Sequence, residues 1–195
     1  CSSDLFCPWW KLVYTPPPPC RTGMAQLQPY GRVLRGKMAK SGKPASILLL
    51  NGPNLNLLGT REPHLYGRET LEQIERRLAA RATAAGVKLQ CVQTNHEGVA
   101  VDCVQQAKRD GVGCILLNPA AFTYSSIALR DALTAVQIPF IEVHLSNIHA
   151  REPWRAHSHF TAVAVGSILG LGGRGYDLAL DFVIGRLKPK GSGGA

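Results

Sequence analysis

Apolar residues in the central part of the chain form short runs separated by amphipathic stretches. Five of these runs predict strands, over residues 46–50, 87–93, 113–117, 139–143 and 163–168. Four of the five are continuous enough to be buried on both faces, which is typical of strands in a parallel sheet. The pattern therefore favours a parallel sheet that is covered by helices.

The stretches between the runs carry apolar residues at helical spacing. The first helix is expected to begin at Thr70, which forms a capping box with Gln73, and to stop at Gly86. Three more helices are expected, at about 98–110, between a cap at Ser125 or Ser126 and Pro139, and at about 174–186. This alternation predicts one doubly wound α/β domain, a flavodoxin-like five-stranded parallel sheet in three α/β/α layers.

The two ends of the chain lack this pattern. Residues 1–45 hold seven of the 13 prolines and no sustained apolar period, so we expect a disordered or non-native leader, with the true start near Met38. A secretory signal is the alternative, but the segment has no basic region followed by an apolar core and a cleavage site. We expect the α/β domain over 46–187 and a flexible tail over 188–195.

The net charge of +9 would by itself suggest a nucleic acid or an anionic surface as partner. The charge is unevenly placed, however: residues 1–45 carry +6, residues 186–195 carry +3, and residues 46–185 hold 12 basic and 12 acidic side chains. We therefore expect no nucleic-acid partner. We also expect no membrane span, because no apolar run approaches the ~18 residues that a span requires.

Six cysteines could in principle form disulfides, but three of them lie in the expected leader. The others, Cys91, Cys103 and Cys114, are an odd number without CxxC spacing, and each lies in an apolar strand or helix pattern. We interpret them as core thiols of a protein in a reducing compartment, the cytoplasm, and not as metal ligands.

The ligand crevice of a doubly wound sheet lies beyond the carboxyl ends of its strands, so the loops after the strands are the candidate site. The first of these, residues 51–67, is rich in glycine but lacks the GxxxxGK[ST] and GxGxxG patterns of nucleotide-binding loops. His144 and His149 lack the spacing of a metal site. The other histidines are interpreted as surface, core or structural residues: His64, His96, His149, His157 and His159.

Four loop segments, in this order and spacing, carry a family resemblance: NGPNLNLLGTREPHLYG, QTNHEG, NPAAFTYSSIALRDA and EVHLSNIHAREPWRAHS. From about 46 to 187 the chain closely resembles the type II 3-dehydroquinate dehydratases of the shikimate pathway. The resemblance implies a lyase without metal or cofactor that converts 3-dehydroquinate to 3-dehydroshikimate by anti elimination through an enolate, the third step of chorismate and aromatic amino acid biosynthesis. It also implies a homo-oligomer, a dodecamer of four trimers.

By the same resemblance, Tyr66 is the base that removes a proton next to the substrate ketone, and Arg61 activates it. A tyrosine with a pKa near ~10 is about one part in a thousand ionised at pH 7, a deficit of roughly 4 kcal/mol. A guanidinium within ~4 Å contributes about 4 kcal/mol at an effective dielectric near 20, so one arginine is about sufficient. Gly59 and Gly67 flank this segment, and we expect it to act as a lid.

The resemblance assigns two further catalytic roles, to Asn54, which holds a water for the enolate oxygen, and to His144, which protonates the departing hydroxyl. Glu142 lies two residues before His144 on the same predicted strand, so the two side chains point to the same face. We expect Glu142 to hydrogen-bond the imidazole and to hold it charged. A solvated carboxylate at the strand end is the alternative.

Substrate binding is also assigned by resemblance. The substrate carboxylate is expected at the backbone N–H groups of Leu145 and Ser146, with Asn118 close by, and the ring hydroxyls at Arg155. Asp131 matches the acid that reaches into the site of a neighbouring subunit across the trimer interface. An exposed ion pair on a helix face is the alternative for Asp131.

One position departs from the family. Tyr124 lies where the family usually has a histidine that touches the substrate. A tyrosine keeps a donor and an acceptor but cannot become cationic near pH 7, so we expect recognition to survive with changed affinity and pH dependence. A flavin or nucleotide binder and a regulatory binding module on the same fold are the alternative functions, although neither explains four matching loops.

Overall fold

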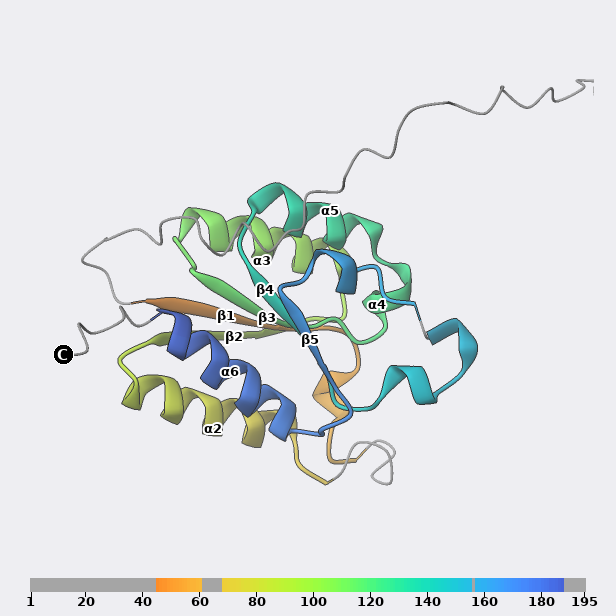
Figure 1. The fold of residues 1–195 in the computed structure, drawn as a ribbon, viewed down its shortest axis with the longest axis horizontal. Helices are drawn as coiled ribbons and strands as arrows, with labels where there is room; N and C mark the ends of the chain where they lie inside the picture. The colour runs from red at the N-terminus through yellow and green to blue at the C-terminus, as the bar shows by residue number, and fades with distance from the viewer. Residues whose placement is uncertain (1–44, 61–67, 156, 188–195) are drawn as a thin grey trace, which may run out of the picture.

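Five strands form one sheet at the centre of the molecule. The computed structural model describes residues 45–60, 68–155 and 157–187, so the expectations for residues 1–44 and 188–195 lie outside the described part of the chain. The strands are β1 (Ser46–Asn51), β2 (Lys88–Gln93), β3 (Cys114–Asn118), β4 (Phe140–His144) and β5 (Gly166–Leu169). All pairs are parallel, and the order β2-β1-β3-β4-β5 confirms the flavodoxin-like, doubly wound fold (Figure 1).

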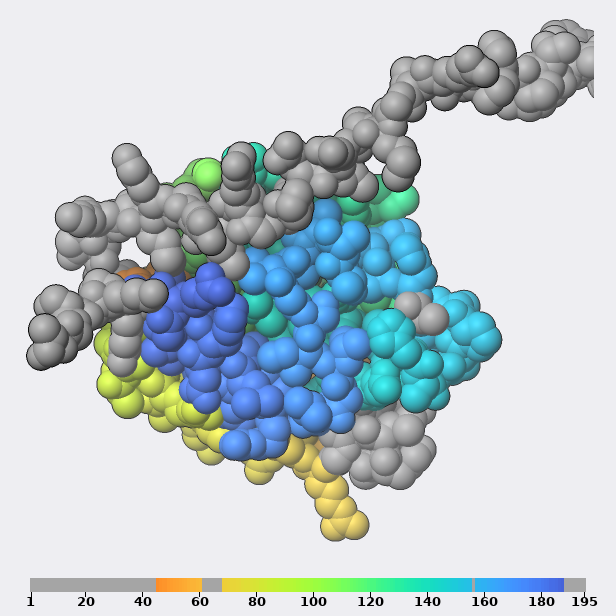
Figure 2. Space-filling model, in the orientation of Figure 1, coloured from red at the N-terminus to blue at the C-terminus, as the bar shows by residue number. Residues whose placement is uncertain are grey.

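Helices cover both faces of the sheet and complete the three expected layers (Figure 1). On one face lie α2 (Leu71–Ala84) and α6 (Arg174–Leu187), and on the other α3 (Glu97–Arg109) and α5 (Ile127–Val136). In the space-filling view the blue surface of α6 lies beside that of the segment containing β5 (Figure 2). Shorter elements in the loops are η2 (Leu55–Leu57), α4 (Phe122–Ser125), η3 (Ile148–Ala150), η4 (Pro153–Arg155) and η5 (Thr161–Val163).

Successive residues of the inner strands face opposite helix layers. Leu49 and Leu116 belong to the core under α2 and α6, whereas Leu50 and Leu117 belong to the core under α3 and α5. All residues of β3 and β4 are buried, and so is β1 after its first residue, but β2 and β5 are more exposed. Three strands, and not the expected four, are therefore buried on both faces, because the helices cover the middle of the sheet more fully than its edges.

The expected boundaries of the last strand, 163–168, are wrong, because β5 begins only at Gly166. The N–H groups of Val163 and Ala164 donate to the Phe160 carbonyl at 2.9 and 3.0 Å, so the backbone turns here before it joins the sheet. Both side chains still pack against the core under α3 and α5. Their apolar character reflects this packing and not a strand.

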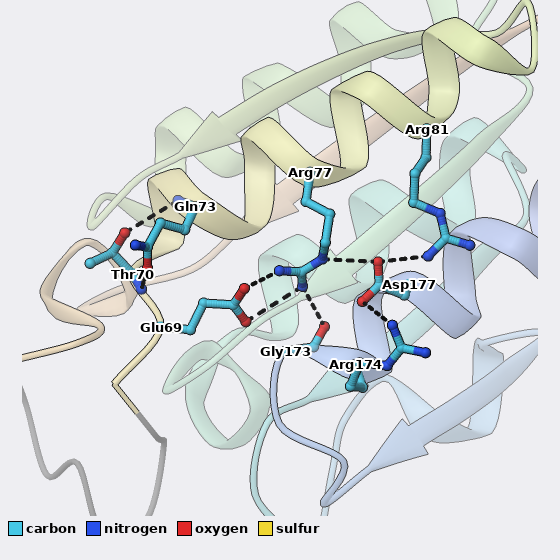
Figure 3. Close-up of polar contacts among 8 residues, drawn as sticks. All are labelled: Glu69, Thr70, Gln73, Arg77, Arg81, Gly173, Arg174 and Asp177. Carbon is cyan, nitrogen blue, oxygen red and sulfur yellow. Dashed lines mark hydrogen bonds and ion pairs between the residues drawn. The ribbon is translucent and has the colours of Figure 1, made fainter.

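Local sequence signals set the helix ends as expected. Thr70 Oγ1 accepts from the Gln73 N–H at 3.2 Å, and Gln73 Oε1 accepts from the Thr70 N–H at 2.9 Å, which confirms the capping box (Figure 3). Ser126, and not Ser125, caps α5 by accepting from the Leu129 N–H at 3.0 Å. Gly86 follows α2 with φ of 71°, a conformation that favours glycine.

One buried carboxylate joins α2 to α6. Asp177 of α6 accepts hydrogen bonds from Arg77 Nε at 3.1 Å and from Arg81 at 2.8 Å, and Arg174 lies 3.6 Å from its second oxygen. Arg77 also pairs with Glu69, which precedes α2 (Figure 3). The cluster therefore ties the middle and the last turn of α2 to the last helix.

The three cysteines of the described residues are free. Cys114 is buried, whereas Cys91 and Cys103 are half-buried at the edges of the two cores, so the interpretation as core thiols holds fully only for Cys114. Burial raises the pKa of the Cys91 and Cys114 thiols to about 12. No helix within the described residues is both long and apolar enough to cross a membrane.

Candidate active site

The carboxyl ends of β1, β3 and β4 bring three buried polar side chains to one edge of the sheet. Asn51 and Asn118 end β1 and β3 and are partners in the strand register, and His144 ends β4. All three are at least 96% buried. The polar loops identified in the sequence begin at this edge, which is where doubly wound sheets bind ligands.

Glu142 and His144 form a buried pair, as their spacing predicts. Glu142 Oε1 lies 2.8 Å from His144 Nε2, and Glu142 is fully buried, so the alternative of a solvated carboxylate is wrong. Burial alone would raise the pKa of the Glu142 carboxyl, but hydrogen bonds from His144, Ser158 and Thr161 outweigh it and hold this pKa below its ordinary value. An ionised carboxylate only accepts hydrogen bonds, so Nε2 is the donor and Nδ1 is left for another partner.

Three hydroxyl groups complete the surroundings of the Glu142 carboxylate. Ser158 donates to Oε1 at 2.6 Å, and Thr161 and Ser167 donate to Oε2 at 2.6 and 3.1 Å. No pattern in the sequence predicts a role for these residues. Ser158 lies at the end of the fourth loop segment quoted above, whereas Thr161 and Ser167 follow it without a recognisable signal.

A second buried network includes Asn51 and Asn118. Asn118 Nδ2 donates to the Tyr176 hydroxyl at 2.7 Å, and that hydroxyl donates to Asn51 Oδ1 at 2.8 Å. Asn51 Nδ2 in turn donates to Glu75 at 3.2 Å. Burial raises the pKa of Tyr176 and of Glu75, so the phenol stays neutral and can donate and accept at once. Sequence reasoning misses Tyr176, because in a helical pattern it resembles an ordinary core aromatic residue.

The loops after β1 and β3 touch through their backbones. The Gly52 N–H donates to the Asn118 carbonyl at 2.8 Å, and a Cβ on Gly52 would collide with the Pro119 carbonyl, so only glycine fits. Two residues later, Asn54 adopts the left-handed conformation with φ of 66°, and its N–H donates to Asn95 Oδ1 at 2.9 Å. Asn54 is exposed in this loop.

Tyr124 and Arg155 are brought together by Trp154. The Arg155 guanidinium lies 4.0 Å from the Trp154 ring centroid and 5.5 Å from that of Tyr124, and the two aromatic rings meet edge to face at 5.2 Å. Arg155 Nε also donates to Glu152 at 2.8 Å. Tyr124 and Arg155 are predicted binding residues, whereas the sequence predicts no role for Trp154, which contacts both.

The other predicted binding residues lie on two elements. Leu145 and Ser146 follow β4 directly, the first buried and the second half-buried. Asp131 lies on the exposed side of α5, and its side chain pairs with Arg130 at 3.7 Å. Among the described residues, no hydrogen bond or ion pair links Asp131 to another candidate residue.

Arg61 and Tyr66, with His64 and the expected hinge Gly67, lie outside the described residues. The flanking residues are described and lie against each other: a Cβ on Gly59, whose φ is 87°, would come within 3.1 Å of the Arg68 carbonyl oxygen. Gly59 and Arg68, which are described on either side of these residues, therefore both lie beside the start of α2.

The remaining described histidines lie at the surface or in loops. His149 and His157 are exposed, His159 is half-buried, and the exposed His96 precedes α3, so all four occupy surface or loop positions. In the part of the chain that the structure describes, no three His, Cys, Asp or Glu side chains come close enough to hold a metal ion.

Comparison with known proteins gives one consistent result. Residues 45–184 match the family model described as "Dehydroquinase class II". The chain is 60% identical over 135 residues to a 3-dehydroquinate dehydratase of Chromobacterium violaceum, a match that spans 69% of this chain and 86% of the relative. It is 59% identical over 139 residues to one of Ralstonia nicotianae, over 71% of this chain and 89% of the relative. The crystal structure of a type II dehydroquinase from Butyrivibrio crossotus matches with a TM-score of 0.71 and 41% identity, over 73% of this chain and 99% of that one.

Proposed function

Since the chain belongs to the class II dehydroquinase family, and is thus a 3-dehydroquinate dehydratase and hydro-lyase, we propose that it removes water by anti elimination through an enolate. The reaction places it in the shikimate pathway. We assign it to the third step of chorismate and aromatic amino acid biosynthesis in the cytoplasm. The observation that carries the proposed course is the buried Glu142–His144 pair at the carboxyl end of β4.

The first step is removal of the proton next to the substrate ketone. Tyr66 acts as the base, and Arg61, five residues earlier, stabilises its phenolate. The electron pair of the broken C–H bond moves into the enolate. Asn54 holds a water that donates to the enolate oxygen; its fixed backbone at the end of β1 supports this role, because such donors act best when they are placed in advance.

The second step is loss of the hydroxyl group. The enolate electrons return to form the carbon–carbon double bond while the hydroxyl leaves, and His144 protonates it so that water is released. The geometry supports His144 as the acid, because Nε2 is committed to Glu142 and Nδ1 is available to the substrate. Glu142 fixes the ring and balances its positive charge.

Binding is assigned to groups around these two steps. Leu145 and Ser146 offer backbone N–H groups to the substrate carboxylate, and Asn118 lies at the end of the adjacent strand. The Arg155 guanidinium donates hydrogen bonds to the ring hydroxyls. Its stacking on Trp154 beside Tyr124 supports this role, since a stacked guanidinium keeps its N–H donors in a fixed plane.

The assembly is part of the same proposal. Asp131 contributes to the site of a neighbouring subunit across the trimer interface, and four trimers form a dodecamer. The exposed position of Asp131 on α5 is compatible with such a contact, because its side chain is 70% exposed in the single chain. No metal or cofactor takes part in the proposed steps.

Formation of the conjugated enone product, followed by ultraviolet absorbance after addition of 3-dehydroquinate, tests this proposal. We expect an absorbance rise with the unaltered protein and a rate at least about 100-fold lower for Tyr66→Phe and for His144→Asn, the size of general acid–base contributions. No rise with the unaltered protein would refute the activity. Full activity of either variant would refute the role of that residue.

A further inference from the structure

The charge of Glu142 has no cationic arginine or lysine partner among the described residues. Its ion-pair partner is His144, and its other contacts are the hydroxyls of Ser158, Thr161 and Ser167. A carboxylate that is fully buried loses the stabilisation of water, so its charge depends on the donors that replace it. Four donors, two on each oxygen, perform this function here.

The hydroxyl groups around Glu142 act as donors, because an ionised carboxylate can only accept hydrogen bonds. The Ser158 hydroxyl accepts from the Phe160 N–H at 3.0 Å and from the Thr161 N–H at 3.4 Å, so its proton is directed at Glu142 Oε1. Thr161 and Ser167 both approach Oε2, and a carboxylate that accepts two hydroxyl protons there has little capacity left to hold a proton of its own.

The positions of these hydroxyls are built into the fold. Ser167 is the register partner of Glu142 on the neighbouring strand β5. Ser158 and Thr161 flank Phe160, which is fully buried and anchors the turn before β5. The late start of β5 is therefore what places two of the three hydroxyls above the carboxylate.

The other elements around Glu142 bring no competing charge among the described residues. Its register partner on β3 is Leu117, and it shares its face of the sheet with Phe140, opposite the apolar buried residues of α3 and α5. His157 and His159, in the segment with Ser158, contact each other at 5.4 Å between ring centroids. His144 is the ionisable group that these elements place against the carboxylate.

We propose that Ser158, Thr161 and Ser167 are positioning residues that keep Glu142 ionised, so that the proton shared by Glu142 and His144 stays on the imidazole. This inference rests on the proposed function, in which His144 is the acid. In a buried site the neutral form of the pair, with the proton on Glu142, competes with the ion pair, with the proton on His144. Burial favours the neutral form because it penalises both charges. The three hydroxyl donors stabilise the ionised carboxylate more than the neutral carboxyl, and they thereby favour the form in which His144 has a proton to deliver.

Thr161→Val removes one hydroxyl at almost constant volume, and Thr161→Ser keeps the hydroxyl. We expect kcat to fall about tenfold in Thr161→Val with little change in KM, the size of one hydrogen bond to a charged group, and to recover in Thr161→Ser. The acid side of the pH profile of kcat should move up by about one pH unit in the valine variant, because a lost donor raises the pKa of Glu142. Thr83→Val, which removes an exposed hydroxyl bonded to the Ala79 carbonyl, is the matched control and should leave both unchanged.

Nitrogen NMR of the His144 ring gives a readout that a general loss of structure does not produce. We expect the spectra of Thr161→Val and of Ser167→Ala to show a larger share of the neutral ring than the spectrum of the unaltered protein under the same conditions. Ser167 is exposed on an edge strand, so its variant stays informative if Thr161→Val does not fold. Unchanged profiles and spectra in the folded variants would overturn the inference, and so would a Thr161→Ser variant as impaired as Thr161→Val.

The outcome is distinguishable from failure of the proposed function. If His144→Asn keeps full activity, His144 is not the acid and the proposed course fails. If His144→Asn is inactive while the hydroxyl variants match the unaltered protein, the proposed course stands and the inference about the hydroxyls fails.

Discussion

The Tyr176 hydroxyl on the last helix lies 2.8 Å from Asn51 Oδ1 at the end of the first strand, 125 residues earlier in the chain. The same hydroxyl accepts from Asn118 at the end of β3. One buried phenol thus fixes the side-chain amides that end two neighbouring strands. The loops that hold Asn54 and Tyr124 begin directly after these amides, so their relative placement depends on a residue of the last helix.

Tyr176→Phe should destabilise the protein by about 1–3 kcal/mol, because it leaves the buried Asn51 oxygen and an Asn118 N–H without their partner. Urea unfolding measures the change. Thr134→Val, which removes an exposed hydroxyl bonded to the Arg130 carbonyl, is the control and should cost less than about 0.5 kcal/mol. Equal effects of the two substitutions would contradict a special role of the buried hydroxyl.

Asp177→Asn should destabilise the protein by about 2 kcal/mol or more, because it removes the buried charge that two arginines of α2 share. Asp181→Asn is a matched control, since Asp181 pairs with Arg81 at the surface and is 54% exposed. Its effect should stay below about 1 kcal/mol. Thermal unfolding of the two variants side by side decides between a buried anchor and an ordinary surface network.

Stability should fall in acid partly through Glu142. Its folded-state pKa is lowered, so the ionised carboxyl contributes stability that is fully present above the ordinary glutamate pKa of about 4.3 and is lost as the pH falls through the lower folded value. The melting temperature of the unaltered protein should therefore drop relative to that of Glu142→Gln between about pH 5 and pH 3. Glu72→Gln, at a side chain 80% exposed, controls for loss of a surface carboxyl. Melting temperatures of the unaltered protein and of Glu142→Gln that fall in parallel across this pH range would contradict the prediction.

Tyr124→His introduces the residue that the sequence resemblance implies at this position. Tyr124 contacts Trp154 and Arg155. The roles assigned to Tyr124 and Arg155 concern substrate binding, so we expect the substitution to change KM more than kcat. Steady-state kinetics at pH 6 and pH 8 test this, since a histidine with an ordinary pKa of about 6.5 changes charge between them and a tyrosine does not. A collapse of kcat with an unchanged KM would place Tyr124 in the chemical steps instead.

Much of the fold could be predicted from local patterns. The apolar runs locate the three inner strands, and Thr70 with Gln73 sets the start of α2, because these signals act between residues close in the sequence. The pairing of Glu142 with His144 follows from strand alternation for the same reason. The prediction is wrong for the last strand, where Val163 and Ala164 are apolar because they pack against a core and not because they extend a sheet.

The sequence by itself thus determined the layers of the fold, the strand ends at the candidate site, and the Glu142–His144 pair. Only the tertiary structure decided that Ser158, Thr161 and Ser167 donate to Glu142, that Tyr176 joins Asn51 to Asn118, and that Trp154 contacts both Tyr124 and Arg155. The physical reason is that a hydroxyl or an aromatic ring has the same local pattern whether it faces water or a buried partner. Its partner is chosen by the folding of segments that are distant in the chain.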